Sequence, residues 1–449
     1  MKRYEAYKQT GVEWYPAIPQ GWEWRYLFQV AHEQTIKKPA DEMYPVMTLS
    51  YGEIKRKKNT EAGLVPSNYD SYQMLYKGNI VLRLIDLQND HTSLRTGLVK
   101  ETGIITSAYT CIMPTENPAY IQNLLHSYDT KKVFYGYGGG VRQSIGFKDI
   151  RHLRVPVPPR DEQDQIVRYL DWQVSKINRL IAAKRKQIAL LHEQHKRRIS
   201  EAVLHGIEDG CCQKDSGVEW IGMIPEHWSV IRCKYVFTER DERSIAGEEE
   251  HLSMSQKYGL VPDSKLDERR MLSESYVGGK VCYKNDLVLN RLKAHLGVFA
   301  LSPQKGVISP DYTVLIPNAE RILPTYSEAV LKSDLCRREL RIRVRGIIEG
   351  FWRLYTDDFN TIVIPLPTLK EQRQIMEYIG ALDEKFTVLK QNLEKEIVVL
   401  HDLRTRLISD VVTGQVDVRR IEVPEYEHVD DTDVVNELTD EPDEDTEVE

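Results

Sequence analysis

The chain has 449 residues, of which 41% are hydrophobic and 29% charged, a composition typical of a globular protein with room for about three domains. It has no run of about 18 apolar residues and no apolar stretch behind its basic start, so the sequence excludes a membrane-spanning helix and predicts no signal peptide. Six cysteines without a C-x-x-C spacing predict reduced thiols, no metal site and a cytoplasmic location.

The net charge of −7 hides two parts of opposite sign. Residues 424–449 hold 13 acidic and no basic residues, which leaves 61 basic residues against the other 55 of the 68 acidic ones, a net charge of +6. A segment of this composition cannot bury enough apolar surface to fold, so residues 416–449 are predicted to be a disordered acidic tail. The tail either keeps the protein in solution or competes with nucleic acid for the basic body.

A repeat begins close to the N-terminus. "TGVEWYPAIPQGW" (10–22) returns as "SGVEWIGMIPEHW" (216–228), and further matches follow at "YKGNIVLR" (76–83) with "YKNDLVLN" (283–290) and "ITSAYTCIMP" (105–114) with "ISPDYTVLIP" (308–317). A period of this length indicates a duplicated domain, whose two copies we place at 1–155 and 207–364. The identical positions of the opening motif are Gly11/Gly217, Val12/Val218, Glu13/Glu219, Trp14/Trp220, Ile18/Ile224, Pro19/Pro225 and Trp22/Trp228.

Each copy ends at a Pro-x-Pro segment, after which the apolar period becomes that of a long helix, predicted at 156–206 and 365–415. Each segment would hold a helix of about 45 residues, which at about 1.5 Å per residue is about 65 Å long. Such a helix is too long for one domain to cover, so antiparallel pairing is favoured over packing on the helix's own domain. The apolar residues of the predicted seam are Ile166, Leu170, Ile177, Leu180, Leu191 in the first helix and Ile375, Ile379, Leu382, Phe386, Leu389, Leu393, Leu400, Leu403, Leu407 in the second. Half of the first helix's seam is polar, and its apolar stripe is wide, so that helix is expected to face more than one partner.

Candidate catalytic motifs are weak throughout the chain. "FYGYGGG" (134–140) has the spacing of a methyltransferase cofactor loop but no preceding strand, and "NPAY" (117–120) is typical of a turn that opens a helix. Glu162 and Glu371 lie in first helical turns, where the helix dipole explains them. We therefore predict no catalytic residues and no metal site.

Basic and amide side chains gather in matching loops of both copies, where the sequences differ. Lys and Arg suit phosphates and guanine edges, and Asn and Gln suit adenine edges, so these loops are predicted to bind DNA. The candidates are Lys55, Arg56, Lys57, Lys58, Arg83, Gln88, Asn89, His91, Arg95, Lys131, Lys132, Arg142, Gln143, Asn290, Arg291, Lys293, His295, Arg341, Arg343, Arg345 and Arg353.

The ordered pair of G-V-E-W-x3-I-P-x2-W openings, the strands that end in Y-T-x-x-x-P and the "PRDEQDQI" and "TLKEQRQI" helix starts resemble the specificity subunit of type I restriction–modification systems. The resemblance covers about residues 10–420; the acidic extension departs from the family pattern, as does Tyr15-Pro16-Ala17 where the second copy has Ile221-Gly222-Met223.

The resemblance implies an α+β fold of two tandem α/β target recognition domains, joined by two long helices in an antiparallel, pseudo-twofold coiled coil. It implies a non-catalytic subunit that reads a bipartite, asymmetric double-stranded DNA target. Two methyltransferase subunits would dock on the helices, and two motor-nuclease subunits would complete the complex; S-adenosylmethionine, ATP and Mg would bind to those partners. The alternatives are a self-sufficient methyltransferase or nuclease and a coiled-coil scaffold with no DNA role.

Overall fold

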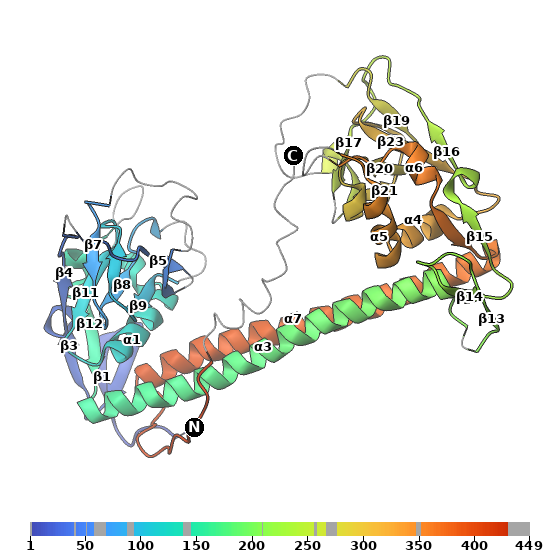
Figure 1. The fold of residues 1–449 in the computed structure, drawn as a ribbon. Helices are drawn as coiled ribbons and strands as arrows, with labels where there is room; N and C mark the ends of the chain where they lie inside the picture. The colour runs from blue at the N-terminus through green and yellow to red at the C-terminus, as the bar shows by residue number, and fades with distance from the viewer. Residues whose placement is uncertain are drawn as a thin grey trace. The chain divides into compact units, whose positions relative to one another are not determined.

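The computed structural model describes residues 2–39, 42–50, 52–57, 69–87, 94–137, 145–208, 210–255, 258–265, 276–346 and 352–429 (Figure 1). The chain divides into two compact units. Unit 1 contains the residues up to Lys184 and the segment that begins at Lys395, and unit 2 contains Arg185–Glu394. Each unit therefore includes part of both long helices, α3 (Arg160–His205) and α7 (Leu369–Val412).

Unit 1 is built on an antiparallel four-stranded sheet in the order β4-β11-β8-β9, with four two-stranded ladders around it, β1-β2, β3-β12, β5-β6 and β7-β10. Helix α1 (Pro118–Thr130) packs on this sheet, and α2 (Phe147–Ile150) is a short connection. The strands are β1 (Tyr7–Val12), β2 (Tyr15–Pro19), β3 (Glu23–Tyr26), β4 (Ala31–Gln34), β5 (Met47–Ser50), β6 (Glu53–Arg56), β7 (Gln73–Leu75), β8 (Ile80–Leu82), β9 (Thr96–Leu98), β10 (Gly103–Ile105), β11 (Thr110–Pro114) and β12 (Arg154–Val157).

Unit 2 has the same topology, with the sheet β16-β23-β20-β21 and the ladders β13-β14, β15-β24, β17-β18 and β19-β22. Its helices are α4 (Pro324–Lys332), α5 (Asp334–Arg343) and α6 (Thr356–Asn360). The strands are β13 (Gln213–Asp215), β14 (Met223–Pro225), β15 (Ser229–Arg232), β16 (Phe237–Arg240), β17 (Leu252–Ser255), β18 (Gly259–Pro262), β19 (Lys280–Cys282), β20 (Leu287–Asn290), β21 (Phe299–Leu301), β22 (Gly306–Ile308), β23 (Tyr312–Pro317) and β24 (Val363–Leu366).

The repeated segments fold alike because their turns use the same chemistry. In unit 1 the Asn79 side chain accepts the backbone N–H of Tyr76 at 2.7 Å, and in unit 2 Asp286 accepts that of Tyr283 at 2.8 Å. Each turn leads directly into a fully buried strand, β8 or β20. The "NPAY" segment opens α1, since the Asn117 side chain accepts the backbone N–H groups of the first turn.

Every ladder between the named strands is antiparallel, so each unit is α+β. The description of the individual domains as α/β was wrong, because consecutive strands are joined without the helical crossovers that parallel strands need. No helix in the described part of the chain is long and apolar enough to cross a membrane.

The predicted seam agrees with burial over part of its length. Leu180, Leu389 and Leu403 are 52%, 41% and 50% exposed, which corrects their assignment to the seam. An α-helix turns every 3.6 residues rather than 3.5, so a straight helix drifts about 20° per heptad and its buried stripe moves to neighbouring positions, such as Ile397 and Ile408. Of the other seam residues, Ile166, Leu170, Ile177, Ile375, Ile379 and Leu407 are buried and Leu191, Leu382, Phe386, Leu393 and Leu400 are half-buried.

The first part of the predicted disordered tail is ordered against unit 1. Val418 is completely buried, and the side chain of Gln165 on α3 donates to the carbonyls of Val418 at 3.1 Å and Ile421 at 2.7 Å. Residues 416–429 have apolar side chains and α3 donors to pack against, so the tail prediction was wrong for them. Residues 430–449 lie outside the described residues.

Candidate nucleic-acid interface and helix anchors

The repeated opening motif anchors each unit to the start of a long helix. In unit 1 the indole N–H of Trp22 donates to Glu162 Oε1 at 3.0 Å, and Tyr4 donates to the same oxygen at 2.6 Å. Glu162 lies in the first turn of α3, where a carboxylate also complements the helix dipole. Trp22 is 1% exposed and therefore cannot stack on a base.

Unit 2 repeats this anchor at the start of α7. The indole of Trp228 donates to Glu371 Oε1 at 2.9 Å, and His227 Nε2 lies 2.6 Å from the same oxygen. Burial alone raises the pKa of Glu371, but hydrogen bonds from His227, Thr368 and Trp228 outweigh it and lower the pKa to about 2. The carboxylate therefore stays ionised when the anchor is formed.

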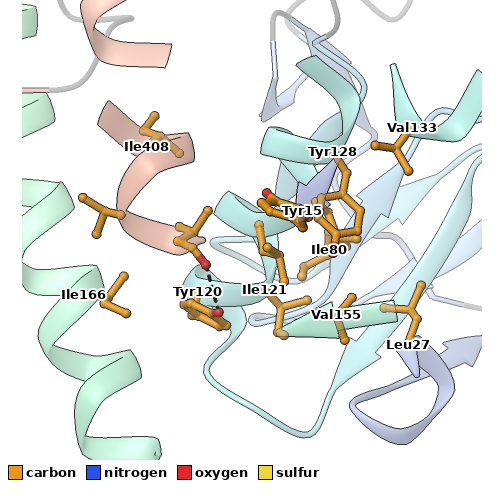
Figure 2. Close-up of a cluster of buried hydrophobic side chains, with 14 of the residues drawn as sticks. Tyr15, Leu27, Ile80, Tyr120, Ile121, Tyr128, Val133, Val155, Ile166 and Ile408 are labelled. Carbon is orange, nitrogen blue, oxygen red and sulfur yellow. Dashed lines mark hydrogen bonds between the residues drawn. The ribbon is translucent and has the colours of Figure 1, made fainter. Parts of the chain in front are cut away.

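A tyrosine in each unit contacts the C-terminal turn of a long helix, α7 in unit 1 and α3 in unit 2. In unit 1 the Tyr120 hydroxyl lies near the last turn of α7, 3.2 Å from the Val412 carbonyl, and Figure 2 shows the residue between α1 and that turn. In unit 2 the Tyr326 hydroxyl donates to the Val203 carbonyl of α3 at 2.9 Å. Carbonyls in the last turn of a helix have no partner within the helix, so the tyrosines satisfy them.

A glutamine completes the anchor in each unit. Gln163 donates to the Pro158 carbonyl at 3.0 Å and accepts the backbone N–H of Asn117, also at 3.0 Å. Gln372 donates to the Pro367 carbonyl at 3.0 Å and accepts the backbone N–H of Leu323 at 2.7 Å. The same contacts of a tryptophan, a glutamate, a tyrosine and a glutamine thus recur in both units, and we call this set of contacts the frame.

Several predicted DNA-binding residues in the described part of the chain lie outside this frame, in or next to the strands and helices of the two units. In unit 1, Arg83 follows β8 directly and is exposed, and Lys57 follows β6 and is half-exposed. Lys55 lies 3.2 Å from Glu53, and Arg56 donates to Glu101 at 2.8 Å. Such exposed ion pairs contribute little to stability, so a phosphate can replace the carboxylate.

Arg95 is a structural residue, which corrects its assignment to DNA binding. Its side chain is buried, and its guanidinium donates to the carbonyls of Arg83 at 3.0 Å, Ile85 at 2.6 Å and Asp86 at 2.8 Å. A buried charge is held by such internal hydrogen bonds, and these bonds fix the backbone of the loop that presents Arg83.

Lys131 and Lys132 lie at the end of α1 and contact aromatic rings of their own unit. The ammonium of Lys131 is 4.2 Å from the ring centroid of Tyr15, and that of Lys132 is 4.7 Å from that of Tyr135. Both side chains are exposed, so they can still meet phosphates at this edge of unit 1.

In unit 2 the candidates converge at the loop end of β20. Asn290 is the last residue of β20, and its side chain accepts the backbone N–H groups of Leu292 at 3.1 Å and Lys293 at 3.3 Å. Arg291 donates to Thr313 Oγ1 at 2.9 Å and lies 3.8 Å from Glu239. These bonds hold both polar side chains beside the start of β23.

Two arginines, Arg345 and Arg353, lie opposite each other close to the end of β20. Arg345 and Arg353 pair through backbone bonds of 2.9 Å and 2.8 Å, and their side chains are 71% and 44% exposed. Arg345 pairs with Asp358, and Arg353 lies 3.3 Å from Asp311. The backbone N–H of Leu354 donates to the Arg291 carbonyl at 3.0 Å, which joins this pair of arginines to the end of β20.

The helix α5 carries further basic residues, which differ in their freedom. Arg341 is exposed, whereas Arg343 donates to the Glu339 carbonyl at 3.0 Å and pairs with the Glu339 carboxylate. His295 lies within the 3-10 helix Ala294–Leu296. The candidates outside the described residues are Lys58, Gln88, Asn89, His91, Arg142 and Gln143.

Sequence reasoning missed the aromatic residues of this interface. Tyr312 lies opposite Asn290 in the β20-β23 ladder, and Tyr355, close to Arg353, is 46% exposed. An aromatic ring beside basic residues suits nucleic acid as well as basic residues do. Tyr355 lies in a segment that differs between the copies, which was the available signal, whereas Tyr312 begins β23 and is repeated as Tyr109 in the first copy.

Comparisons with known proteins give one family. A family model described as "Type I restriction modification DNA specificity domain" matches residues 240–398. A putative type I restriction enzyme MjaX specificity subunit of Methanocaldococcus jannaschii is 24% identical over 330 residues, 69% of this chain and 71% of that protein. The MjaVIII specificity subunit of the same organism is 24% identical over 287 residues, 61% of this chain and 64% of that protein, just under two thirds of its length.

A solved structure from work on complex assembly and conformational transition of the type I R-M system covers 89% of this chain and 99% of its own, with 16% identity and a TM-score of 0.56. The HsdS subunit from Thermoanaerobacter tengcongensis aligns over 89% of this chain and 98% of its own, with 16% identity and a TM-score of 0.44. The first likeness shows a shared fold.

Proposed function

This chain belongs to the specificity subunits of type I restriction–modification systems, and we propose that its two units read the two halves of a split, asymmetric DNA sequence. The observation that carries the proposal is the frame built twice. Glu162 with Trp22 and Glu371 with Trp228 make the same anchor, while the loops beyond the two sheets carry different residues. Two readers of different half-sites need a common frame and different loops.

Recognition would combine two kinds of contact. Exposed guanidinium groups such as Arg83, Arg345 and Arg353 suit phosphates, which position each unit and make the affinity depend on salt. Amide side chains such as Asn290 suit base edges, which supply the sequence information.

The long helices would serve as the spacer, paired antiparallel with pseudo-twofold symmetry. Support comes from each unit separately. In unit 1, Lys184 lies 2.7 Å from Glu396 and Arg404 donates to Asn178 at 2.9 Å. In unit 2, His195 lies 2.8 Å from Asp383. Between the two pairs of unit 1 the residue number falls on α7, from 404 to 396, as it rises on α3, from 178 to 184, as antiparallel pairing requires. The proposed division is then 1–155, 156–206, 207–364 and 365–415, followed by the C-terminal segment.

Partner subunits would dock on the same helices. Leu180 on α3 and Leu389 on α7 are separated by 209 residues, as are Glu162 and Glu371, and are 52% and 41% exposed. Leu190 and Val399 form a second such pair, 49% and 64% exposed. Exposed apolar residues at matching places suit two copies of one partner. We assign these surfaces to two methyltransferase subunits, with two motor-nuclease subunits completing the complex.

The chain itself would be non-catalytic, with S-adenosylmethionine, ATP and Mg on the partners. The test is co-expression with the methyltransferase subunit encoded beside it, followed by mapping of methylated adenines. We expect one bipartite motif, in which exchange of residues 1–155 for those of a relative changes one half only. Methylation or cleavage by the purified chain alone would establish a self-sufficient enzyme, and a complex without sequence-specific DNA binding would establish a scaffold.

A further inference from the structure

The face of α3 that lies in unit 1 is covered by the chain's own C-terminal segment, residues 419–429, which we call the strap. The side chain of Ser175 donates to the Glu427 carbonyl at 3.0 Å and accepts the backbone N–H of Val429 at 2.8 Å. Nearer the start of α3, Gln165 donates to the Ile421 carbonyl at 2.7 Å. The strap therefore runs in the same direction as α3 and is held at both ends by α3 side chains.

Among the residues that the structure describes, none covers the matching face of α7 in unit 2 in this way. Ser175 is 2% exposed, whereas Glu384, its equivalent 209 residues later, is exposed. Tyr169 is 3% exposed, whereas its equivalent Tyr378 is 37% exposed. Gln165 is half-buried, and its equivalent Gln374 is exposed. The two helices are thus alike in sequence pattern and unlike in what covers them.

The contacts that hold the strap are suited to release. Most of them use backbone carbonyls of the strap, and the net contribution of such a hydrogen bond is small because water replaces it after release. Between its two ends the strap borders a solvent-open groove lined by Arg168, Asp171, Arg420, Ile421 and Tyr426. The Arg179–Glu427 ion pair, 3.4 Å long, is exposed on both sides and weakens with salt.

We propose that the strap makes the two methyltransferase-docking faces of this chain unequal. One subunit binds first to the open face of α7 in unit 2, and the second reaches the matching face of α3 only after the strap leaves it. This inference rests on the proposed function, and it takes each docking surface to extend from its exposed leucine, Leu180 or Leu389, towards the start of the helix, where the strap covers α3 and not α7. The strap then acts as a tethered competitor for the second docking event.

The test measures the two dissociation constants of the methyltransferase subunit encoded beside this chain, by native mass spectrometry of a titration. For the full chain we expect them to differ by about tenfold or more, within the usual range of coupling between sites. A chain that ends after Val418, and separately the variant Gln165→Ala/Ser175→Ala, should bring them within about threefold once the statistical factor for two identical sites has been removed from both constants.

The matched control is the chain that ends after Val429, which loses residues 430–449 but keeps the strap contacts with Gln165 and Ser175, and its ratio of the two constants should stay near that of the full chain. Equal constants in the full chain, or a difference that persists without the strap, would overturn the inference and leave the proposed function standing. If no version binds the methyltransferase subunit, the docking proposal itself fails, and the inference with it.

Discussion

Two arginines that are neighbours in one loop of unit 1 have opposite roles. Arg83 is exposed at the end of β8, and Arg95 is buried and holds the loop by three carbonyls. Their residue type and loop are the same, so the sequence predicted one role for both. Only the fold decides which guanidinium faces inward.

This difference can be measured. Arg95→Ala should lower the free energy of unfolding by about 3 kcal/mol, because it leaves buried carbonyls unsatisfied. Arg83→Ala should leave the urea unfolding midpoint unchanged and should reduce the slope of log affinity against log salt by about 1 in the assembled complex. A variant Arg95→Ala that unfolds like the wild type but loses DNA affinity would return Arg95 to the interface.

The contribution of the unit 2 anchor to stability depends on pH through the ionisation of Glu371. Its pKa in the folded chain is about 2, below the ordinary value of 4.5, so its contribution is complete above about pH 4.5 and is lost as the pH falls towards 2. We expect Glu371→Gln to lower stability at pH 7 and to flatten the fall of unfolding free energy between pH 4.5 and 2. Urea unfolding of the wild type and of Glu371→Gln at several pH values measures this difference. Equal dependence of the unfolding free energy on pH in the two proteins would contradict the prediction.

At the scale of elements, the turn after α7 shows how closely the frame is packed. Gly414 has φ of 71°, and a Cβ there would lie 2.4 Å from Pro19. Gly11, in the same unit, has φ of 72° and no atom within 4 Å of such a Cβ. Alanine costs about 1 kcal/mol at a positive φ, so Gly11→Ala should show that cost alone.

Gly414→Ala should cost about 2–4 kcal/mol in urea unfolding, because the clash with Pro19 adds to the backbone strain. Equal losses for the two variants would show that the turn adjusts without disturbing the anchor of Trp22.

The sequence could predict the elements that repeat and not the contacts that close them. The doubled motif indicated an anchor, yet Tyr120 reaches a carbonyl 292 residues away, which no local pattern encodes. The polar positions of the first helix were expected to face another protein. One polar seam position, Lys184, lies 2.7 Å from Glu396 of α7. Ser175 and Gln165 lie outside the predicted seam and bind the chain's own C-terminal segment, which no pattern in the sequence indicated. Leu403 was misplaced because a strict heptad was assumed.

At the scale of the whole molecule, the helices are proposed to set the distance between the DNA half-sites. Seven residues inserted after Lys184 and seven after Glu394 would lengthen both helices by about 10 Å, or about three base pairs, and rotate them by only about 20°. Methylome sequencing should then show a spacer about three base pairs longer. An insertion in one helix alone is the control and should lower stability; an unchanged spacer with both insertions would rule out the ruler.

The division of the chain into two units also predicts the order in which the units fold during translation. Apart from Pro442–Glu449, unit 2 is formed by one stretch, Arg185–Glu394, whereas unit 1 needs the segment that begins at Lys395, which is translated after that stretch. Domains generally fold as they leave the ribosome, so unit 2 completes its helix pair while unit 1 still waits for the last turn of α7 to reach Tyr120. A chain whose translation stops before residue 412 can therefore complete only unit 2. Unit 1 can fold completely only after residue 412 has been translated, because its Tyr120 contacts the Val412 carbonyl.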